Sequence, residues 1–67
     1  MNESRWYLTV FVLDRGIGDL GTLKLRAFAP DVGTAYRACL LTQIELEPTA
    51  IRLHTFCQPE ELLDAAS

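Results

Sequence analysis

Three segments of the chain have the apolar and polar pattern of β-strands. Residues 5 to 14 (RWYLTVFVLD) are almost continuously apolar and rich in β-branched and aromatic side chains, which predicts a central strand covered on both faces. Residues 22 to 28 and residues 49 to 57 instead alternate between apolar and polar positions. That period of two is typical of half-buried strands, so we expect these two segments to flank the first.

One segment has the spacing of a helix. Residues 32 to 46 place apolar side chains three and four positions apart, and Pro48 ends the pattern. Asp31 is suited to accept a backbone N–H at the start of this helix. The stripe expected to face the sheet consists of Val32, Tyr36, Cys39, Leu40 and Ile44. Residues 59 to 61 (PEE) favour a short C-terminal helical turn, because proline and carboxylates suit a helix N-terminus.

The order of these elements predicts an α+β fold with ββαβ organisation. The first two strands form a hairpin, the helix crosses one face of the sheet, and the last strand returns antiparallel beside the first. This gives a three-stranded antiparallel sheet of order 2-1-3, one helix packed on one face, and the C-terminal helical turn. A chain of 67 residues has room for one hydrophobic core, so we interpret residues 1–67 as a single domain.

The segment GIGDLG, residues 16 to 21, has the glycine spacing of a dinucleotide-binding fingerprint. That fingerprint requires a helix to begin within the glycines, so that its N–H groups meet the phosphates. Here a strand of period two follows instead. We therefore interpret the segment as a hairpin loop, with glycines supplying positive φ and Asp19 favouring a turn. No cofactor is expected.

One helix covers only one face of the sheet, so the other face is the expected contact surface. If the aliphatic side chains meet the helix, the covered set is Leu8, Val10, Val12, Leu23, Leu25, Ile51 and Leu53. The opposite face then mixes aromatic rings with cations: Tyr7, Thr9, Phe11, Lys24, Arg26, Phe28, Arg52, His54 and Phe56.

The sequence leaves three alternatives for what contacts that face. In the first, the face packs against the terminal segment or a second copy of the chain, since small chains need additional burial. In the second, the face recognises a protein, for which rings and arginines are the usual anchors. In the third, it stacks single-stranded nucleic acid on its aromatic residues. The net charge of −3 ranks direct nucleic-acid binding below the other two, because phosphate neutralisation needs clustered cations.

The residue content excludes most catalytic sites. Serine occurs only at Ser4 and Ser67, so a serine triad cannot be assembled from structured positions. His54 and Cys57 point to opposite faces of one strand, and Cys39 is expected in the core. Two cysteines and one misdirected histidine do not make a metal site. We therefore expect a non-catalytic protein without metal or cofactor, in which Cys39 and Cys57 form a disulfide only if they lie close together in an oxidising compartment.

Two features of the sequence bear on where in the cell the protein is expected. The longest apolar run, residues 6 to 13, is far below the ~20 residues of a membrane span. No small-residue cleavage site follows the N-terminal residues MNESR, so we expect no signal peptide and a cytoplasmic protein that does not bind membranes.

Size, acidity and the strand-strand-helix-strand order resemble the small proteins of phages and mobile elements, among them anti-CRISPR inhibitors. The helix start at residues 31 to 38 (DVGTAYRA) is similar to helix starts in such proteins. The resemblance implies a stoichiometric inhibitor or modulator that occludes a larger nucleic-acid-handling protein or ribonucleoprotein complex in the host cytoplasm. It also implies that carboxylates can stand where phosphates would sit, and the candidates are Glu45, Glu47, Glu60, Glu61 and Asp64.

Overall fold

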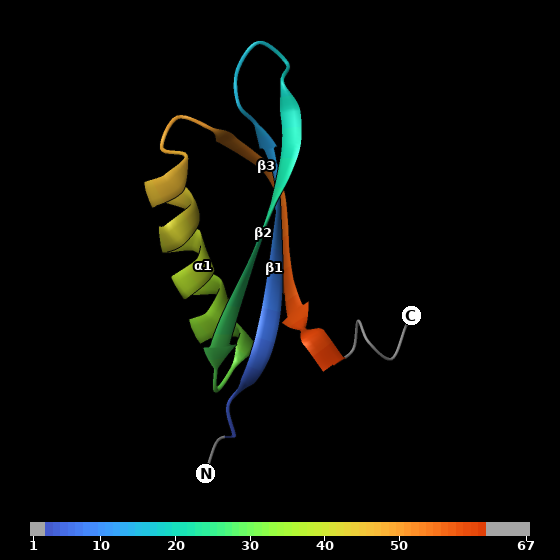
Figure 1. The fold of residues 1–67 in the computed structure, drawn as a ribbon, viewed down its shortest axis with the longest axis vertical. Helices are drawn as coiled ribbons and strands as arrows, with labels where there is room; N and C mark the ends of the chain where they lie inside the picture. The colour runs from blue at the N-terminus through green and yellow to red at the C-terminus, as the bar shows by residue number, and fades with distance from the viewer. Residues whose placement is uncertain (1–2, 62–67) are drawn as a thin grey trace.

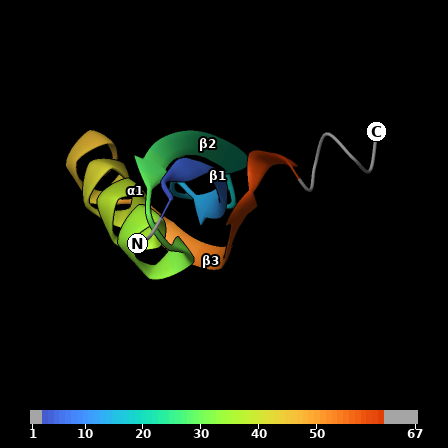
Figure 2. The same ribbon diagram turned by 90° about the horizontal axis from the view of Figure 1, so that it is seen from below.

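The computed structural model describes residues 3 to 61 and has the predicted α+β architecture (Figure 1). Its elements in chain order are β1 (Arg5–Asp14), β2 (Leu20–Ala29), α1 (Val32–Leu46) and β3 (Ile51–Pro59). The strands form one antiparallel sheet of order β2-β1-β3, and α1 lies on one side of it (Figure 2). The predicted fold class is therefore confirmed, with the predicted bounds for β1 and α1.

The two flanking strands differ from their predicted bounds by one to two residues. β2 extends the predicted segment at both ends, because the whole of β1 is available as a pairing partner from Asp14↔Leu20 to Arg5↔Ala29. β3 begins at Ile51, since a turn in which Ala50 N–H donates to Glu47 C=O occupies the preceding residues. Glu60 and Glu61 are helical, and the rest of the predicted C-terminal turn lies outside the described residues.

The segment GIGDLG forms the predicted hairpin loop between β1 and β2. Gly16 and Gly18 have φ of 124° and 72°, a conformation that glycine adopts without a steric cost. Asp14 helps to close the loop, because its carboxylate accepts a hydrogen bond from Gly16 N–H at 2.9 Å. Ile17 lies between the two glycines with φ of 56°, which is unusual for a β-branched residue. Its side chain is fully exposed.

Helix α1 begins as predicted and buries a narrower face than predicted. The Asp31 carboxylate accepts a hydrogen bond from Thr34 N–H at 2.8 Å and thereby caps the helix. The buried residues are Ala35, Cys39 and Gln43, spaced by four positions. Of the stripe predicted to face the sheet, only Cys39 is buried and Leu40 half-buried, while Val32, Tyr36 and Ile44 are exposed. Small side chains at Ala35 and Cys39 allow the helix to approach the sheet closely, which leaves the larger neighbours outside.

The face of β1 that the helix covers is opposite to the predicted one. Thr9 pairs with Leu25 and Phe11 with Leu23, so the odd-numbered residues of both strands share a face. The covered residues of β1 are Tyr7, Thr9, Phe11 and Leu13, all buried. They pack in two clusters, Tyr7 with Ala29 and Ala35, and Phe11 with Leu13 and Cys39. The prediction that Leu8, Val10 and Val12 meet the helix is therefore wrong.

Strand β3 contains an irregularity that turns Arg52 toward the helix. Val12 pairs with His54, whereas the next residue, Leu13, pairs with Arg52, so that Leu53 is an additional residue in β3. Arg52 consequently lies on the covered side and donates a hydrogen bond from Nη1 to Oε1 of the buried Gln43 at 2.9 Å.

Replacing Phe11 by alanine tests the assignment of the interior. Phe11 is 0% exposed, so we expect Phe11→Ala to lower the free energy of unfolding by about 3–5 kcal/mol. That is a large part of the total for a domain of this size. Phe28→Ala is the matched control, because Phe28 is 60% exposed, and it should cost less than about 1.5 kcal/mol. Urea denaturation measures both, and equal losses would contradict the assignment.

A substitution at Ile17 is predicted to raise the free energy of unfolding. The left-handed backbone costs a β-branched residue roughly 1–2 kcal/mol, whereas asparagine tolerates it. Since the Ile17 side chain is fully exposed and contributes no packing, Ile17→Asn should raise the free energy of unfolding by about 1 kcal/mol. Ile17→Val retains the β-branch and should leave stability unchanged. A thermal melt that ranks the asparagine variant at or below the valine variant would contradict this explanation.

Candidate functional site

The candidate site is the face of the sheet that lies opposite α1. We call it the uncovered face and define it by nine residues from the three strands. It consists of Trp6, Leu8, Val10 and Val12 from β1, Lys24, Arg26 and Phe28 from β2, and His54 and Phe56 from β3. Figure 2 shows α1 on the other side of the sheet.

The pairing register arranges these side chains in cross-strand rows. Val10 lies between Lys24 and Phe56, and Val12 lies beside His54. Leu8 lies beside Arg26 in the next row. The central residues form an aliphatic line along β1, and the larger side chains flank it. Val10 is only 9% exposed because its neighbours shield it, whereas Phe56 is 44% exposed.

An aromatic and ionic cluster occupies the end of the face near the start of β1. The Trp6 and Phe28 rings lie 5.3 Å apart between centroids at a tilt of 58°. The Arg26 guanidinium carbon lies 4.4 Å from the Trp6 ring centroid, a cation–π distance. Arg26 also donates two hydrogen bonds to the carboxylate of Glu60, one of them at 3.0 Å. These bonds raise the pKa of Arg26 and hold its guanidinium across the face.

A shallow hollow adjoins this cluster at the end of the sheet. Its volume is about 300 Å³, and it is lined by Arg5, Trp6, Phe28, Glu60 and Glu61. Arg5 and Glu61 form an ion pair on its rim. Arg5, the cation that lines the hollow, is paired with Glu61, and Glu60 is bonded to the neighbouring Arg26, so the hollow offers rings rather than net charge to a ligand.

The middle of the uncovered face carries a cation of a different kind. Lys24 is exposed beside Val10, and among residues 3–61 no carboxylate forms an ion pair with it. Across β1, the rings of His54 and Phe56 lie 6.0 Å apart between centroids. The central part of the face therefore combines aliphatic surface, one cation and two rings.

Five of the nine residues predicted for the exposed sheet face lie on the uncovered face, namely Lys24, Arg26, Phe28, His54 and Phe56. Tyr7, Thr9 and Phe11 do not, since they are 6%, 0% and 0% exposed beneath the helix. Arg52 does not either, because the irregularity in β3 turns it to Gln43. The predicted positions of Tyr7, Thr9 and Phe11 are wrong because the helix covers the odd-numbered face of β1. The predicted position of Arg52 is wrong because the additional Leu53 shifts the alternation of β3.

Four residues of the uncovered face were missed by the sequence prediction: Trp6, Leu8, Val10 and Val12. The signal that could have found them is the length of the hairpin loop. With five residues, 15 to 19, between Asp14 and Leu20, odd positions of β1 pair with odd positions of β2. The alternation of β2 places Leu23 and Leu25 on the covered side, so the odd residues of β1 follow them.

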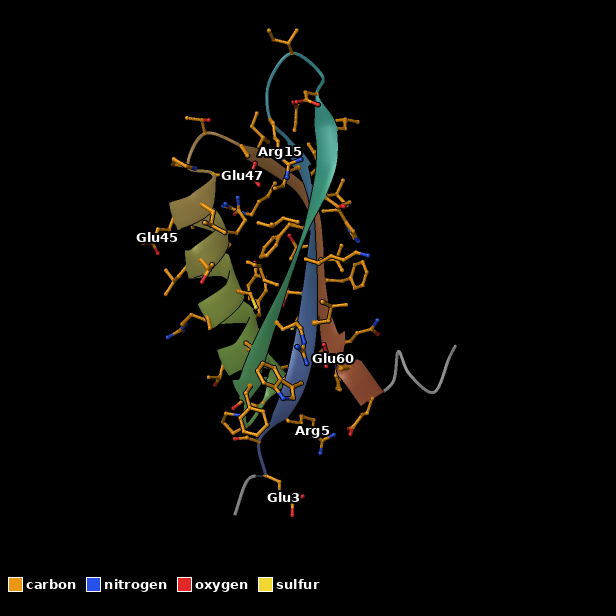
Figure 3. All side chains as sticks on the ribbon, in the orientation of Figure 1. Glu3, Arg5, Arg15, Glu45, Glu47 and Glu60 are labelled. Atoms are coloured by element: carbon orange, nitrogen blue, oxygen red, sulfur yellow. The ribbon has the colours of Figure 1, made fainter. Side chains whose placement is uncertain are left out.

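The predicted acidic residues do not gather into one patch. Glu47 lies beside Arg15 at the end of α1, and Glu60 lies at the other end of the sheet (Figure 3). Glu60 is paired with Arg26, and the adjacent Glu61 is paired with Arg5. Glu45 is exposed on α1. Asp64 lies outside the described residues. Three of the four described carboxylates are thus neutralised by arginines of the same chain, which disfavours phosphate mimicry.

The two cysteines are not bonded to each other. Cys39 is buried, Cys57 is half-buried, and both are free thiols. Within residues 3–61, no three or more histidines, cysteines and carboxylates gather in a way that could hold a metal ion. Nor does that part contain a helix long and apolar enough to cross a membrane.

Comparisons with protein-family models, with curated proteins and with solved structures gave no match for this chain. The uncovered face is therefore interpreted from its own residues.

The Arg15–Glu47 pair predicts a contribution to stability that depends on pH. Hydrogen bonds from Arg15, including Nη2 to Oε2 at 2.9 Å, lower the pKa of Glu47 below its ordinary value of 4.5. A lowered folded-state pKa stabilises the fold above the unfolded-state value, and that stability is lost as the pH falls through the folded-state pKa. The melting temperature should therefore decline below about pH 4.5, and less steeply in Glu47→Gln. Glu45→Gln is the control, because no arginine is bonded to Glu45; equal slopes in all three proteins would contradict the assignment.

Proposed function

We propose that this chain is a non-catalytic protein-binding module whose interface is the uncovered face. The observation that carries the proposal is a sheet face with an aliphatic line along its central strand and exposed rings beside it. Trp6, Phe28 and Phe56 are 44%, 60% and 44% exposed. Exposed apolar surface that is contiguous and flanked by polar groups usually marks a binding site.

A protein partner fits the charges of this face better than a nucleic acid does. Nucleic-acid binding requires cations that are available to phosphates. Arg26 is bonded to Glu60 and stacked on Trp6, which leaves Lys24 as the cation without an ion pair on the described face. The formal net charge of −3 adds long-range repulsion of phosphates.

A more specific version of this proposal adds the partner class that the sequence resemblance implies. In that form the chain inhibits or modulates a larger nucleic-acid-handling complex, as an anti-CRISPR-type protein does. Steric occlusion is then the mode to expect, because Glu47, Glu60 and Glu61 are each bonded to an arginine, which offsets the charge that phosphate mimicry would use. The partner must supply mainly apolar surface.

A photo-reactive phenylalanine derivative tests the interface. Placed at Phe56, it should form adducts with protein, because this side chain protrudes from the uncovered face. Placed at Leu41 it should form few, since Leu41 is similarly exposed, at 61%, but lies on α1 away from the sheet. Excess wild-type chain should compete for those Phe56 adducts that form with a different protein, and excess Phe56→Glu should not.

Two results would contradict the proposal. One is equal adduct formation at Phe56 and Leu41, or equal competition by both chains, which would mean that the face has no specific role. The other is salt-dependent binding of a labelled single-stranded oligonucleotide that is lost in Lys24→Glu, which would instead indicate a nucleic-acid-binding module.

A further inference from the structure

We propose that the partner seated on the uncovered face is a second copy of this chain, packed sheet against sheet about a two-fold axis parallel to the strands. This inference rests on the proposed function and names the occupant of the same face. The result would be a dimer of four layers, with the two sheets inside and the two helices outside.

The extent of the face is adequate for a small dimer interface. Strands of nine or ten residues at ~3.3 Å per residue, with three strands ~4.8 Å apart, give a face of roughly 33 by 14 Å. Side-chain relief raises its accessible area above this roughly 460 Å² projection, toward the ~800 Å² that each partner buries in a standard interface. Leu20 and Ile51, which both pair with Asp14, extend the apolar surface at the hairpin end and are 62% and 61% exposed.

The rows of the face match themselves under this symmetry. Rotation about an axis along the strands keeps each row at its height and exchanges the two flanking strands, so that β2 faces β3 of the other copy. Leu8, Val10 and Val12 of β1 then lie opposite the same residues of the other β1 along the axis, with Leu8 and Val12 half-buried and Val10 only 9% exposed in the single chain. This forms a continuous aliphatic centre of the kind found where two sheets pack.

The flanking residues match as well. Lys24 and Phe56 occupy the same row on opposite sides of Val10. In the dimer, Lys24 of each copy therefore faces the Phe56 ring of the other, which makes two cation–π contacts. In the same way, Arg26 faces Gln58, and Thr22 faces His54. No cation of one copy therefore faces a cation of the other copy across this interface.

The competing two-fold axis, perpendicular to the strands, is less favourable. With Val10 at its centre, that axis places β2 against β2 and brings Lys24 opposite Lys24, a like-charge contact at a desolvated surface. With the axis along the strands, the like-charge contact is Asp14 with Asp14 at the last row. The Asp14 carboxylate is turned to Gly16 N–H, at the end of the sheet where twist separates two packed sheets. The parallel axis is the arrangement that we infer.

Analytical ultracentrifugation of the full chain over a concentration series tests the dimer. The wild-type chain should sediment as a monomer–dimer equilibrium. Val10→Arg places a charge on the two-fold axis and should weaken dimerisation by at least about 100-fold. Phe56→Glu is a second variant, because it removes the ring that faces Lys24 of the other copy. Leu41→Arg on α1 is the matched control. Circular dichroism and a thermal melt check that each variant is folded.

The adducts of the photo-reactive group at Phe56 test the axis. In a mixture of isotopically light and heavy chains, mass spectrometry should find inter-chain adducts on β2 around Lys24. Adducts on β3 of the other copy would overturn the inferred axis.

The remaining outcomes separate this inference from the proposed function. A dimer that both Val10→Arg and Phe56→Glu leave intact would overturn the inference, because the contact would use another face. A wild-type chain that stays monomeric would also overturn it, while adducts at Phe56 with a different protein would still support the proposed function. Absence of both the dimer and the Phe56 adducts would overturn both.

Discussion

The length of the β1–β2 loop decides which half of the central strand becomes interior. Five residues separate Asp14 from Leu20, so residues whose numbers have the same parity pair across the hairpin. The half-buried Leu23 and Leu25 of β2 fix the side on which the helix lies. Thr9 and Phe11 are then covered, and Leu8, Val10 and Val12 are left on the other side. A loop one residue longer or shorter would exchange these two sets.

This constraint produces an interior that is small and partly polar. Its largest fully buried side chains are Phe11, Leu13, Gln43 and Thr9. Gln43 accepts a hydrogen bond from Arg52, whereas the Thr9 hydroxyl has no hydrogen-bond partner within residues 3–61. An unsatisfied buried hydroxyl lowers stability, and a chain of this size has little to spare. Additional apolar burial on the uncovered face would stabilise such a fold, which links the thin interior to the proposed interface.

Local sequence patterns were sufficient to predict the strands and the helix but not which face of the sheet the helix covers. The continuous apolar run predicted β1, helical spacing with Asp31 predicted α1, and the glycines predicted the hairpin loop. The aliphatic character of Leu8, Val10 and Val12 was misleading, because both faces of the central strand are apolar and only the register distinguishes them. Arg52 was misplaced because the additional Leu53 shifts the alternation of β3. The pairing of Glu47 with Arg15 joins residues 32 positions apart, which spacing alone does not reveal.

The most direct test of this account is a set of nuclear Overhauser contacts from the buried face of α1. We predict contacts from the Ala35 methyl group to the Tyr7 ring and from the Cys39 β-protons to Phe11 and Leu13, following the two core clusters. Contacts from Ala35 and Cys39 to Leu8, Val10 and Val12 would contradict the account, because they would place the opposite face of β1 beneath the helix.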